Sequence, residues 1–592
     1  MFKKSIVIAV MLLIAVGGNA QVNHRYPRIG IHSWSGAVDE WYAQFDLIST
    51  AEIDVEWAKR IKRLNPEVEI VPTSDWNAGT YIEPFPDEWY IRHADGSKIE
   101  YGGPGSYYAN LSDICPGSST YGGKRVCDYL PELLMQRVDL TVFDGIATDG
   151  LYYQDKELWN YHVVSDNLGW DTDLDGNGVN DFNEHGEEWV VNHWNSGVDI
   201  LFTKLRQLMP SQKLLMINSG SWHYHHHAET NGNFLEHSYG GLTWSWFTQI
   251  YSEFMQTLRQ PNTIFLDYDG DSKNEFRDMR FQLTTSLYGN AYFSYSDPDS
   301  HEHYYNKFYD EYLVDLGYPK GSMTQIGSSG VWVRFFDNGA VVVNVSGSPQ
   351  TVGNADLQSV TGYEGPYFRF QGGQDPIHND GAIFDNINLW GGSDASGTIG
   401  DGYLLLKSPQ TIIYSIIIDN VDMGTSPGTA APEFVGNWNQ YPDPIQDNPY
   451  YTMRVADWFG MYAYAYTSPG NGESKAIYRP TIGYAGYYQV FEWHGWHETS
   501  VDDEATNVPY TIKYHNGQST GTIDQTKNLG RWNSLGTYFF NTGTDGYLEL
   551  TNSANGIVIA DAIKFEFKGD NPDADIEPPN PPQGVEVKKA GK

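Results

Sequence analysis

The amino-acid sequence predicts a multidomain protein: a (β/α)₈ TIM barrel followed by a small β-sandwich and then by a second all-β sandwich module. Three observations favour this architecture. Eight strand-like runs occur within about the first three hundred residues, most of them separated by helix-length stretches. From Gly330 the pattern changes to short strands joined by turns. From about residue 434 apolar and polar residues alternate and aromatic side chains are dense, which is typical of a sandwich.

The stretch 143–151 is the centre of the predicted barrel. A short apolar run ends there in Asp149 and Gly150, which is typical of a buried parallel strand with a carboxylate at its carboxyl end. We interpret it as the fourth strand, with Asp149 at the mouth of the barrel. The alternative is a parallel strand whose final Asp caps the following helix.

The other barrel strands are expected on both sides of this stretch. They are predicted at residues 28–34, 45–49, 68–72, 214–218, 233–237, 264–269 and 291–295. Helices are predicted over 54–64, 128–138 and 277–287, the first of them capped by Asp54.

A long insertion rich in Gly, Tyr and Pro follows the third strand and covers residues 78–128. A loop of this length in a compact domain is usually functional or disordered. It contains the only two cysteines of the chain, Cys115 and Cys127. We expect a disulfide between them, because an exported protein meets an oxidising environment.

The chain is expected to divide into five parts. They are a signal peptide (1–20), the barrel (21–325), the β-sandwich (326–425), the last module (430–568) and a flexible Pro-rich tail (569–592). The β-sandwich begins with a hairpin whose turn contains Asn338 and Gly339.

The amino terminus and the charge indicate where the protein acts. Lys3 and Lys4 precede an apolar core, and residues 18–20 fit a cleavage site, so we expect secretion to the periplasm or the exterior. The formal net charge of −38 argues against nucleic acid and anionic membranes as partners. No later segment is long and apolar enough to span a bilayer, so no membrane insertion is expected.

The most specific local motif covers residues 173–184 and matches the calcium-loop pattern D-x-[DN]-x-[DN]-G-x₅-E throughout. The expected oxygen ligands are Asp173, Asp175, Asn177, the Val179 carbonyl, Asp181 and Glu184. We predict a structural Ca²⁺ beside the active site, and no organic cofactor. The alternative is a surface turn rich in Asp, Asn and Gly that holds no metal.

Carboxylates at the ends of predicted strands form a second group of candidate functional residues. Glycoside hydrolysis needs one protonated acid at the leaving oxygen and one carboxylate across the sugar. We predict Asp149 as the nucleophile and Glu236, at the end of the sixth strand, as the acid/base. Asp75, Asp267 and Asp269 are rivals for either role. Some of these acids can instead cap helices or hold loops.

Further residues near strand ends are expected to bind the substrate, because aromatic faces stack on sugars and polar groups bond their hydroxyls. The predicted substrate-binding residues are His32, Trp34, Asp75, Trp76, Trp222, His223, Asp267 and Asp269. Each can instead serve ordinary packing. The histidine-rich stretch 223–227 invites a zinc site, but zinc ligands usually come from separated positions, so we do not predict one.

Two stretches of the chain resemble known families. In the barrel, residues 29–34, 144–150, 234–236 and 291–295, with 372–376 and 401–405 after it, resemble hypothetical glycoside hydrolase families with a TIM barrel. This resemblance implies glycosidase activity, and it carries the catalytic roles to Asp149 and Glu236. In the last module, residues 478–480, 486–488, 532–538 and 559–563 are similar to the golvesin C-terminal or xanthan-lyase-type carbohydrate-binding module. That resemblance implies sugar binding or adhesion.

The sequence thus predicts a secreted glycoside hydrolase that cleaves a polysaccharide or oligosaccharide. The appended module would raise the substrate concentration at the barrel. One alternative is a non-catalytic polysaccharide-binding surface protein on a barrel scaffold. The other is a polysaccharide lyase, which would need a base and a neutralising cation near the uronate.

Overall fold

A computed structural model gives the structure of the chain. It describes residues 24–33, 38–76, 85–100, 105–149, 171–218, 228–236, 244–270, 272–296, 307–394, 397–440, 465–495 and 503–570. The predicted signal peptide and most of the predicted tail lie outside these residues. Among the described helices, none is long and apolar enough to cross a membrane.

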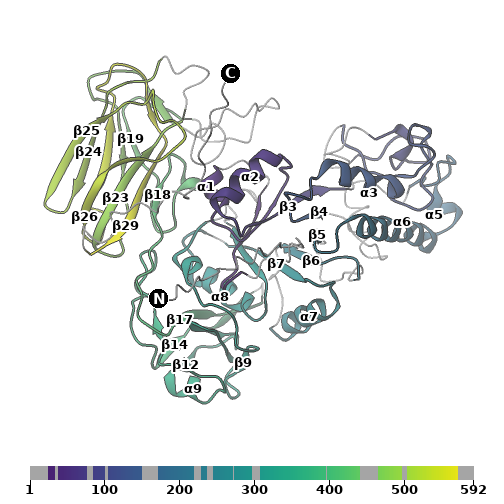
Figure 1. Cartoon of the computed structure of the whole chain (residues 1–592), viewed down its shortest axis with the longest axis horizontal. Coiled ribbons are helices and arrows are strands. Elements are labelled where there is room, and N and C mark those ends of the chain that lie inside the picture. Colours follow the sequence, from purple (N-terminus) through teal and green to yellow (C-terminus); the bar gives the residue numbers. More distant parts are fainter. Residues whose placement is uncertain are drawn as a thin grey trace, which may run out of the picture.

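The first half of the chain forms the predicted (β/α)₈ barrel (Figure 1). Its strands are β1 (Gly30–Ser33), β2 (Leu47–Thr50), β3 (Glu69–Asp75), β4 (Gly145–Asp149), β5 (Leu214–Asn218), β6 (Gly232–Glu236), β7 (Thr263–Asp269) and β8 (Tyr292–Ser296). They pair in chain order and in parallel. A parallel bridge between Ile29 and Phe293 joins the last strand to the first. The predicted fold class is confirmed.

The barrel interior is filled by side chains from alternate positions of the strands. The buried residues that pack together there are Leu47, Val71, Ala147, Leu214, Met216, Phe234, Phe265 and Tyr292. Gly30 is needed at this layer, because a Cβ on it would lie 2.1 Å from the Phe265 ring. The barrel is therefore a packed core, and only its ends can receive a ligand.

Helices surround the strands. They are α1 (Asp39–Tyr42), α2 (Val55–Leu64), α3 (Val126–Arg137), α5 (Asp181–Glu184), α6 (Glu187–Leu208), α7 (Trp244–Thr257) and α8 (Phe276–Ser286). The side chain of Asp54 accepts the backbone N–H of Glu56 and caps α2, as predicted. The predicted helices near 128–138 and 277–287 are confirmed as α3 and α8.

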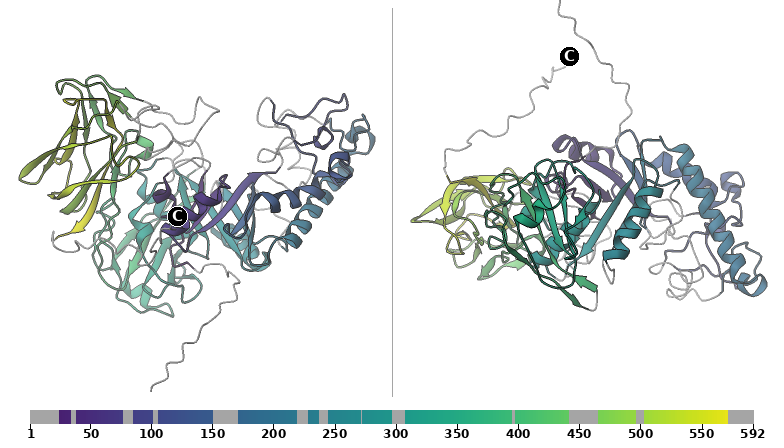
Figure 2. Two further views of the ribbon diagram at one scale, coloured as in Figure 1. Left: turned by 45° about the horizontal axis from the view of Figure 1, so that its top comes forward. Right: turned by 90° about the horizontal axis from the view of Figure 1, so that it is seen from below.

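One side of the barrel carries a projecting arm, which we define as residues 85–100, 105–125 and 171–194 together with α3. Figures 1 and 2 show it on the side opposite the last module. Helix α6 has 22 residues and is therefore about 33 Å long, whereas a five-residue strand spans about 17 Å. Because α6 ends next to the start of β5, its surplus length extends beyond the carboxyl ends of the strands.

The predicted disulfide in the arm is wrong, because Cys115 and Cys127 are both free thiols. Cys115 Sγ donates to the carbonyl of Pro116 at 3.6 Å, and Cys127 Sγ donates to that of Ser112 at 3.7 Å. Burial raises the pKa of each thiol to about 12, so both stay protonated at neutral pH. They behave as small apolar residues in the core of the arm.

The middle unit packs its main sheet against α8 of the barrel. That sheet has the order β13 (Phe368–Arg369), β17 (Asp401–Leu406), β11 (Gly339–Asn344), β10 (Val331–Phe335) and β9 (Thr324–Gln325). Smaller elements are the pairs β12 (Gln350–Val352) with β14 (Ile387–Leu389) and β15 (Gly392–Asp394) with β16 (Gly397–Ile399), and helix α9 (Asn354–Gln358). The predicted hairpin is present, with Phe335 opposite Ala340.

The last module consists of antiparallel sheets. One has the order β18 (Ile416–Ile418), β29 (Ala562–Gly569), β23 (Gly486–Trp493) and β26 (Asn533–Phe540). A second has the order β19 (Glu433–Val435), β22 (Lys475–Tyr478), β27 (Tyr547–Thr551), β24 (Val508–Tyr514) and β25 (Gly517–Ile523). A third joins β20 (Asn439–Gln440), β21 (Ala465–Thr467) and β28 (Val558–Ala560). Strand β18 thus pairs within the last module, although it directly follows the strands of the middle unit.

A buried carboxylate, Asp310, joins the end of the barrel to the middle unit. Its Oδ2 accepts the backbone N–H groups of Gly373 at 2.7 Å and Gln374 at 2.9 Å, and its Oδ1 accepts that of Tyr414 at 2.7 Å. The Tyr414 hydroxyl in turn donates to Gln44 beside α1. The stretch 372–376 therefore has a structural role at this junction.

The neighbouring Glu311 makes the stability of the junction depend on pH. Its burial raises the pKa of Glu311 to about 7, whereas in the unfolded chain it is about 4.3. Between these values the folded state binds more protons than the unfolded state, so the free energy of unfolding should fall as the pH rises from about 5 to about 7, by about 2 kcal/mol. Chemical unfolding of the parent and of Glu311→Gln across this range should give a flatter pH dependence for the variant.

A matched control for this prediction is Glu67→Gln, which neutralises an exposed glutamate in the barrel. The control should keep the pH dependence of the parent. If Glu311→Gln also kept it, another group would have to be responsible.

Candidate active site

The carboxyl ends of the barrel strands bring several predicted site residues to one rim. In the strand register Asp75 is paired with Asp149, and Asp149 is paired with Asn218. On another part of the barrel rim, Glu236 of β6 is paired with Asp267 of the neighbouring strand β7. Because the eight strands are parallel, these positions share the end at which barrel enzymes hold their active sites.

The two predicted catalytic acids occupy strand positions on the interior face of the barrel. Asp149 follows the interior residue Ala147 by two positions in β4, and Glu236 follows the interior residue Phe234 by two positions in β6. Alternate residues of a strand lie on the same face. The backbone of Glu236 is described, but its side chain lies outside the described part of the structure, and the same holds for Asp75 and Asp269.

Asp149 is partly exposed at the end of β4. The amide Nδ2 of Asn218 in β5 donates to Asp149 Oδ1 at 2.9 Å. A donor of this kind fixes the orientation of a carboxylate and favours its ionised form. Asn218 was not among the predicted site residues, although its place at the end of a buried strand is the same signal that marks Asp149.

His32 and Asp267 both lie buried in the barrel wall. His32 Nδ1 is 2.6 Å from Ser49 Oγ, and Ser49 Oγ is 2.6 Å from Thr73 Oγ1, so a polar chain crosses β1, β2 and β3. This chain is one strand away from Asp149 in β4. It can fix the tautomer of the His32 imidazole.

The predicted aromatic residues divide into two groups. Trp76 is buried, its indole N–H donates to Ser74 Oγ at 3.0 Å, and its ring packs against Phe202 of α6. It thus fixes α6 to β3 and does not offer a free ring face. Trp34, Trp222 and His223 lie outside the described residues, together with the rest of the histidine-rich stretch.

The predicted calcium loop lies at the far end of the arm, beyond the rim of the barrel (Figure 1). Asp173 Oδ1 accepts the backbone N–H of Asn177 and Asp173 Oδ2 accepts that of Gly178, both at 2.9 Å. Gly176 and Gly178 have positive φ angles of 75° and 81°, which only glycine adopts readily. The backbone is therefore folded tightly around the carboxylate at the first ligand position.

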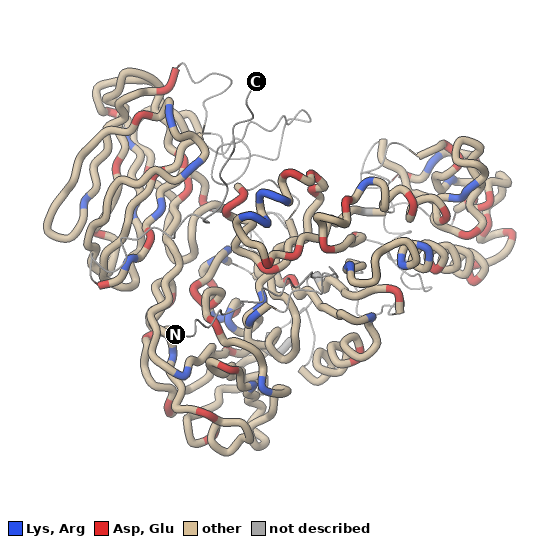
Figure 3. Tube along the Cα trace, in the orientation of Figure 1, with Lys and Arg blue, Asp and Glu red and all other residues tan. Residues whose placement is uncertain are grey.

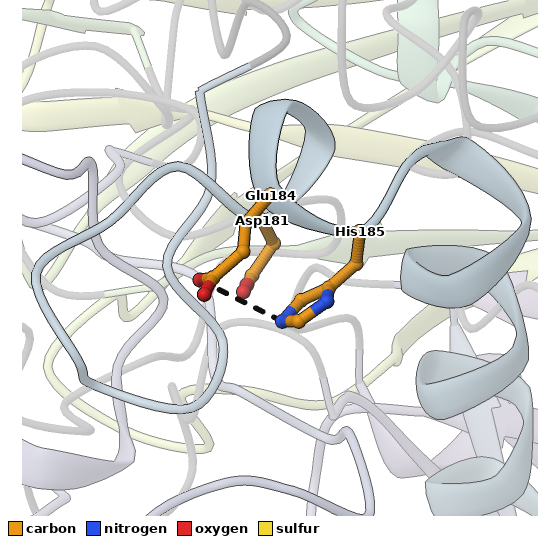
Figure 4. A group of neighbouring side chains, drawn as sticks. All are labelled: Asp181, Glu184 and His185. Atoms are coloured by element: carbon orange, nitrogen blue, oxygen red, sulfur yellow. Dashed lines mark ion pairs between the residues drawn. The ribbon is translucent and has the colours of Figure 1, made fainter.

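Two later acids of the loop, Asp181 and Glu184, lie close to one another. Figure 4 shows the side chains of Asp181 and Glu184 side by side, and His185 forms an ion pair with Glu184 at 3.6 Å. Ligand atoms of these three residues all lie within 4.8 Å of one another. Burial, with Asp173 and Asp175 nearby, raises the pKa of Asp181 to about 6. Acidic positions occur in every part of the described chain, including this end of the arm (Figure 3).

The last module presents an aromatic pair on one face of its four-stranded sheet. Tyr487 of β23 and Phe539 of β26 are opposite one another, with ring centroids 5.1 Å apart. Both are partly exposed, whereas the next residue in each strand is buried in the module. The other end of β23, at Trp493, belongs to the large core shared with the barrel.

Comparison with known proteins identifies this module. Residues 452–567 match the family model of the Golvesin C-terminal domain. The resemblance stated for the last module is therefore confirmed. The match covers less than half of the chain.

A curated relative is the xanthan lyase of Bacillus sp. (strain GL1). It is 26% identical over 182 residues, which are 30% of this chain and 17% of that protein. This chain therefore spans a small part of the relative.

Similar solved structures include two glycoside hydrolases. One is the glycoside hydrolase domain of PelA from Pseudomonas aeruginosa, at 12% identity and a TM-score of 0.28, covering 46% of this chain and 96% of that one. The other is a family 5 glycoside hydrolase from Bacteroides vulgatus, at 10% identity and a TM-score of 0.30, covering 64% and 89%. Likenesses at these scores do not assign the chain to a family.

Proposed function

We propose that this protein is an exported carbohydrate-active enzyme whose barrel hydrolyses glycosidic bonds of a polysaccharide. The observation that carries the proposal is the register of the strand ends. It puts the backbone positions of Asp149 and Glu236 at the same end of one closed barrel, on the interior face of their strands. A glycosidase needs two such acids across a sugar. In this assignment Asp149 is the ionised carboxylate and Glu236 is the acid/base.

The surroundings of Asp149 support its role. The Asn218 amide holds one carboxylate oxygen, which favours the ionised form that attacks or stabilises the sugar cation. Residues at the ends of β3 and β7 supply further polar positions, which can bind sugar hydroxyls. The described arm stands next to this rim and can border an extended substrate.

A polysaccharide panel tests the proposal. The full chain should release reducing ends from at least one polysaccharide, without the ultraviolet absorbance of an unsaturated product. Binding without any release of reducing ends would make the protein a non-catalytic carbohydrate-binding protein and would contradict the proposal.

The second candidate function is a polysaccharide lyase. It is favoured by the similarity to a xanthan lyase, which covers 30% of this chain. Elimination would give an unsaturated uronate product that absorbs ultraviolet light. Reducing ends that appear together with this absorbance would support the lyase over the hydrolase.

The Golvesin-type module is assigned to carbohydrate binding in this proposal, with Tyr487 and Phe539 as its stacking surface. We expect Tyr487→Ala to weaken binding of the active polysaccharide about tenfold, because an aromatic anchor is lost from the contact surface. Affinity electrophoresis on gels that contain the polysaccharide measures this effect.

The control for the module is Tyr318→Ala, which removes an exposed tyrosine at the start of the middle unit. It should migrate like the parent. Equal retardation of Tyr487→Ala and the parent would show that the sugar is bound elsewhere.

A further inference from the structure

Backbone hydrogen bonding joins the calcium loop, which follows β4, to the insertion that follows β3. Asp173 N–H donates to the carbonyl of Arg92 at 2.8 Å, and the two residues form an antiparallel bridge. The side-chain amide of Asn110 donates to the carbonyl of Leu174 at 2.7 Å. Arg92 and Asn110 belong to the insertion after β3, whereas the loop belongs to the insertion after β4, so the arm is built from two separate loops.

Apolar side chains are buried where the two insertions and α6 meet, and they belong to the large core that also includes the barrel. Leu174, the second residue of the calcium loop, is fully buried together with Trp89, Leu111 and Val190. A Cβ on Gly197 of α6 would lie 1.8 Å from the Leu111 carbonyl, so the insertion is in direct contact with the helix backbone. The position of the loop therefore determines how the whole arm packs.

One carboxylate oxygen in the loop indicates a ligand. The Asp181 side chain is fully buried, and its Oδ2 accepts the backbone N–H of Leu174 at 2.6 Å. Its Oδ1 is buried and has no hydrogen-bond partner among the described residues. A buried carboxylate oxygen without a partner is costly. A carboxylate oxygen of Asp181 lies within 4.8 Å of ligand atoms of Glu184 and His185, so a cation held beside these residues would satisfy the unpartnered oxygen.

We infer that residues 173–184 bind one Ca²⁺ and that this ion fastens the two insertions of the arm to each other. Ca²⁺ accepts six to eight hard oxygen ligands in flexible geometry, which the spacing of the loop supplies. The ion would draw Asp181 and Glu184 toward Asp173 and so hold Leu174 in the core of the arm. Mg²⁺ should bind more weakly, because it requires a tighter octahedral site and releases its waters reluctantly.

Calorimetric titration of the full, chelator-treated chain with CaCl₂ tests the site. We expect one Ca²⁺ per chain. Glu184→Gln, which removes the bidentate carboxylate, should weaken binding about tenfold or more, whereas Asn177→Asp, which adds a ligand charge, should tighten it. The gain in Asn177→Asp cannot arise from misfolding. Asp545→Asn, an exposed acid in the last module, should bind like the parent.

Hydrogen exchange tests the fastening. Ca²⁺ should slow amide exchange in residues 89–100 and 105–111 as well as within the loop, and Glu184→Gln should lose both effects. Absence of Ca²⁺ binding by the parent, or unchanged binding by Glu184→Gln, would overturn the site. Loss of binding in His185→Ala would also overturn it, because the ligand set would then be centred on the imidazole. Protection confined to 173–184 would overturn the fastening.

Discussion

Asp149→Asn is expected to lower kcat for polysaccharide cleavage about 10²- to 10⁴-fold, while the affinity for the polysaccharide stays close to that of the parent. The amide has the same shape as the carboxylate, but it can neither attack the sugar nor stabilise the positive charge that develops on it. Because the proposed sugar-binding surface of the last module does not include Asp149, binding should persist. Initial rates of reducing-end release and affinity electrophoresis measure the two quantities separately.

Asn218→Ala is the matched variant for this prediction. It removes the donor at 2.9 Å from Asp149 Oδ1 and leaves the carboxylate in place. The pKa of Asp149 should rise, so the acidic limb of the pH–rate profile should move to higher pH, with a smaller loss of kcat. A full loss of activity in Asn218→Ala with no change in the pH profile would show that Asn218 serves folding alone. Full activity in Asp149→Asn would remove Asp149 from the mechanism.

Asp310→Ala is expected to cost the chain about 3–5 kcal/mol of unfolding free energy. The carboxylate accepts three backbone N–H groups, and the variant leaves all three without their acceptor in a largely buried junction. Each such group costs about 1–3 kcal/mol. Denaturant unfolding followed by tryptophan fluorescence measures the effect.

Asp310→Asn is the conservative control for the junction. Its carbonyl oxygen can still accept the N–H groups of Gly373 and Gln374, whereas its amide group would face the N–H of Tyr414, so its cost should be lower than that of the alanine variant but not zero. Asp545→Asn should leave the free energy unchanged. If Asp310→Ala unfolded within about 1 kcal/mol of the parent, the junction would be held by its apolar contacts and not by Asp310.

The barrel was predictable because its strands are buried on both faces and therefore read as short apolar runs with polar ends. The run 214–218 is identical in bounds to strand β5. The same reasoning led to Asp149, since its position follows from the end of the strand alone. The same reasoning also selected Trp76 as a substrate-binding residue. The position of a residue along a strand does not determine whether its ring faces the mouth of the barrel or packs on a helix, and the Trp76 ring packs on Phe202 of α6.

Features that depend on contacts between distant residues were not predictable. Asp310 finds its partners 63, 64 and 104 residues later in the chain, and β18 pairs with a strand at the end of the last module. The cysteine prediction rested on the expected compartment, yet each buried thiol has its own carbonyl partner. The spacing of residues 173–184 indicated which oxygen atoms could bind a cation, whereas the distance of this loop from the mouth of the barrel depends on the length of α6.

The most direct test of the central claim is an experimental structure of Asp149→Asn with an oligosaccharide of the polysaccharide that the parent cleaves. We predict that the sugar occupies the carboxyl end of the barrel, with residues 149 and 236 on the two sides of one glycosidic bond. An oligosaccharide bound only to the last module, or a Glu236 side chain turned away from the bound sugar, would contradict the account.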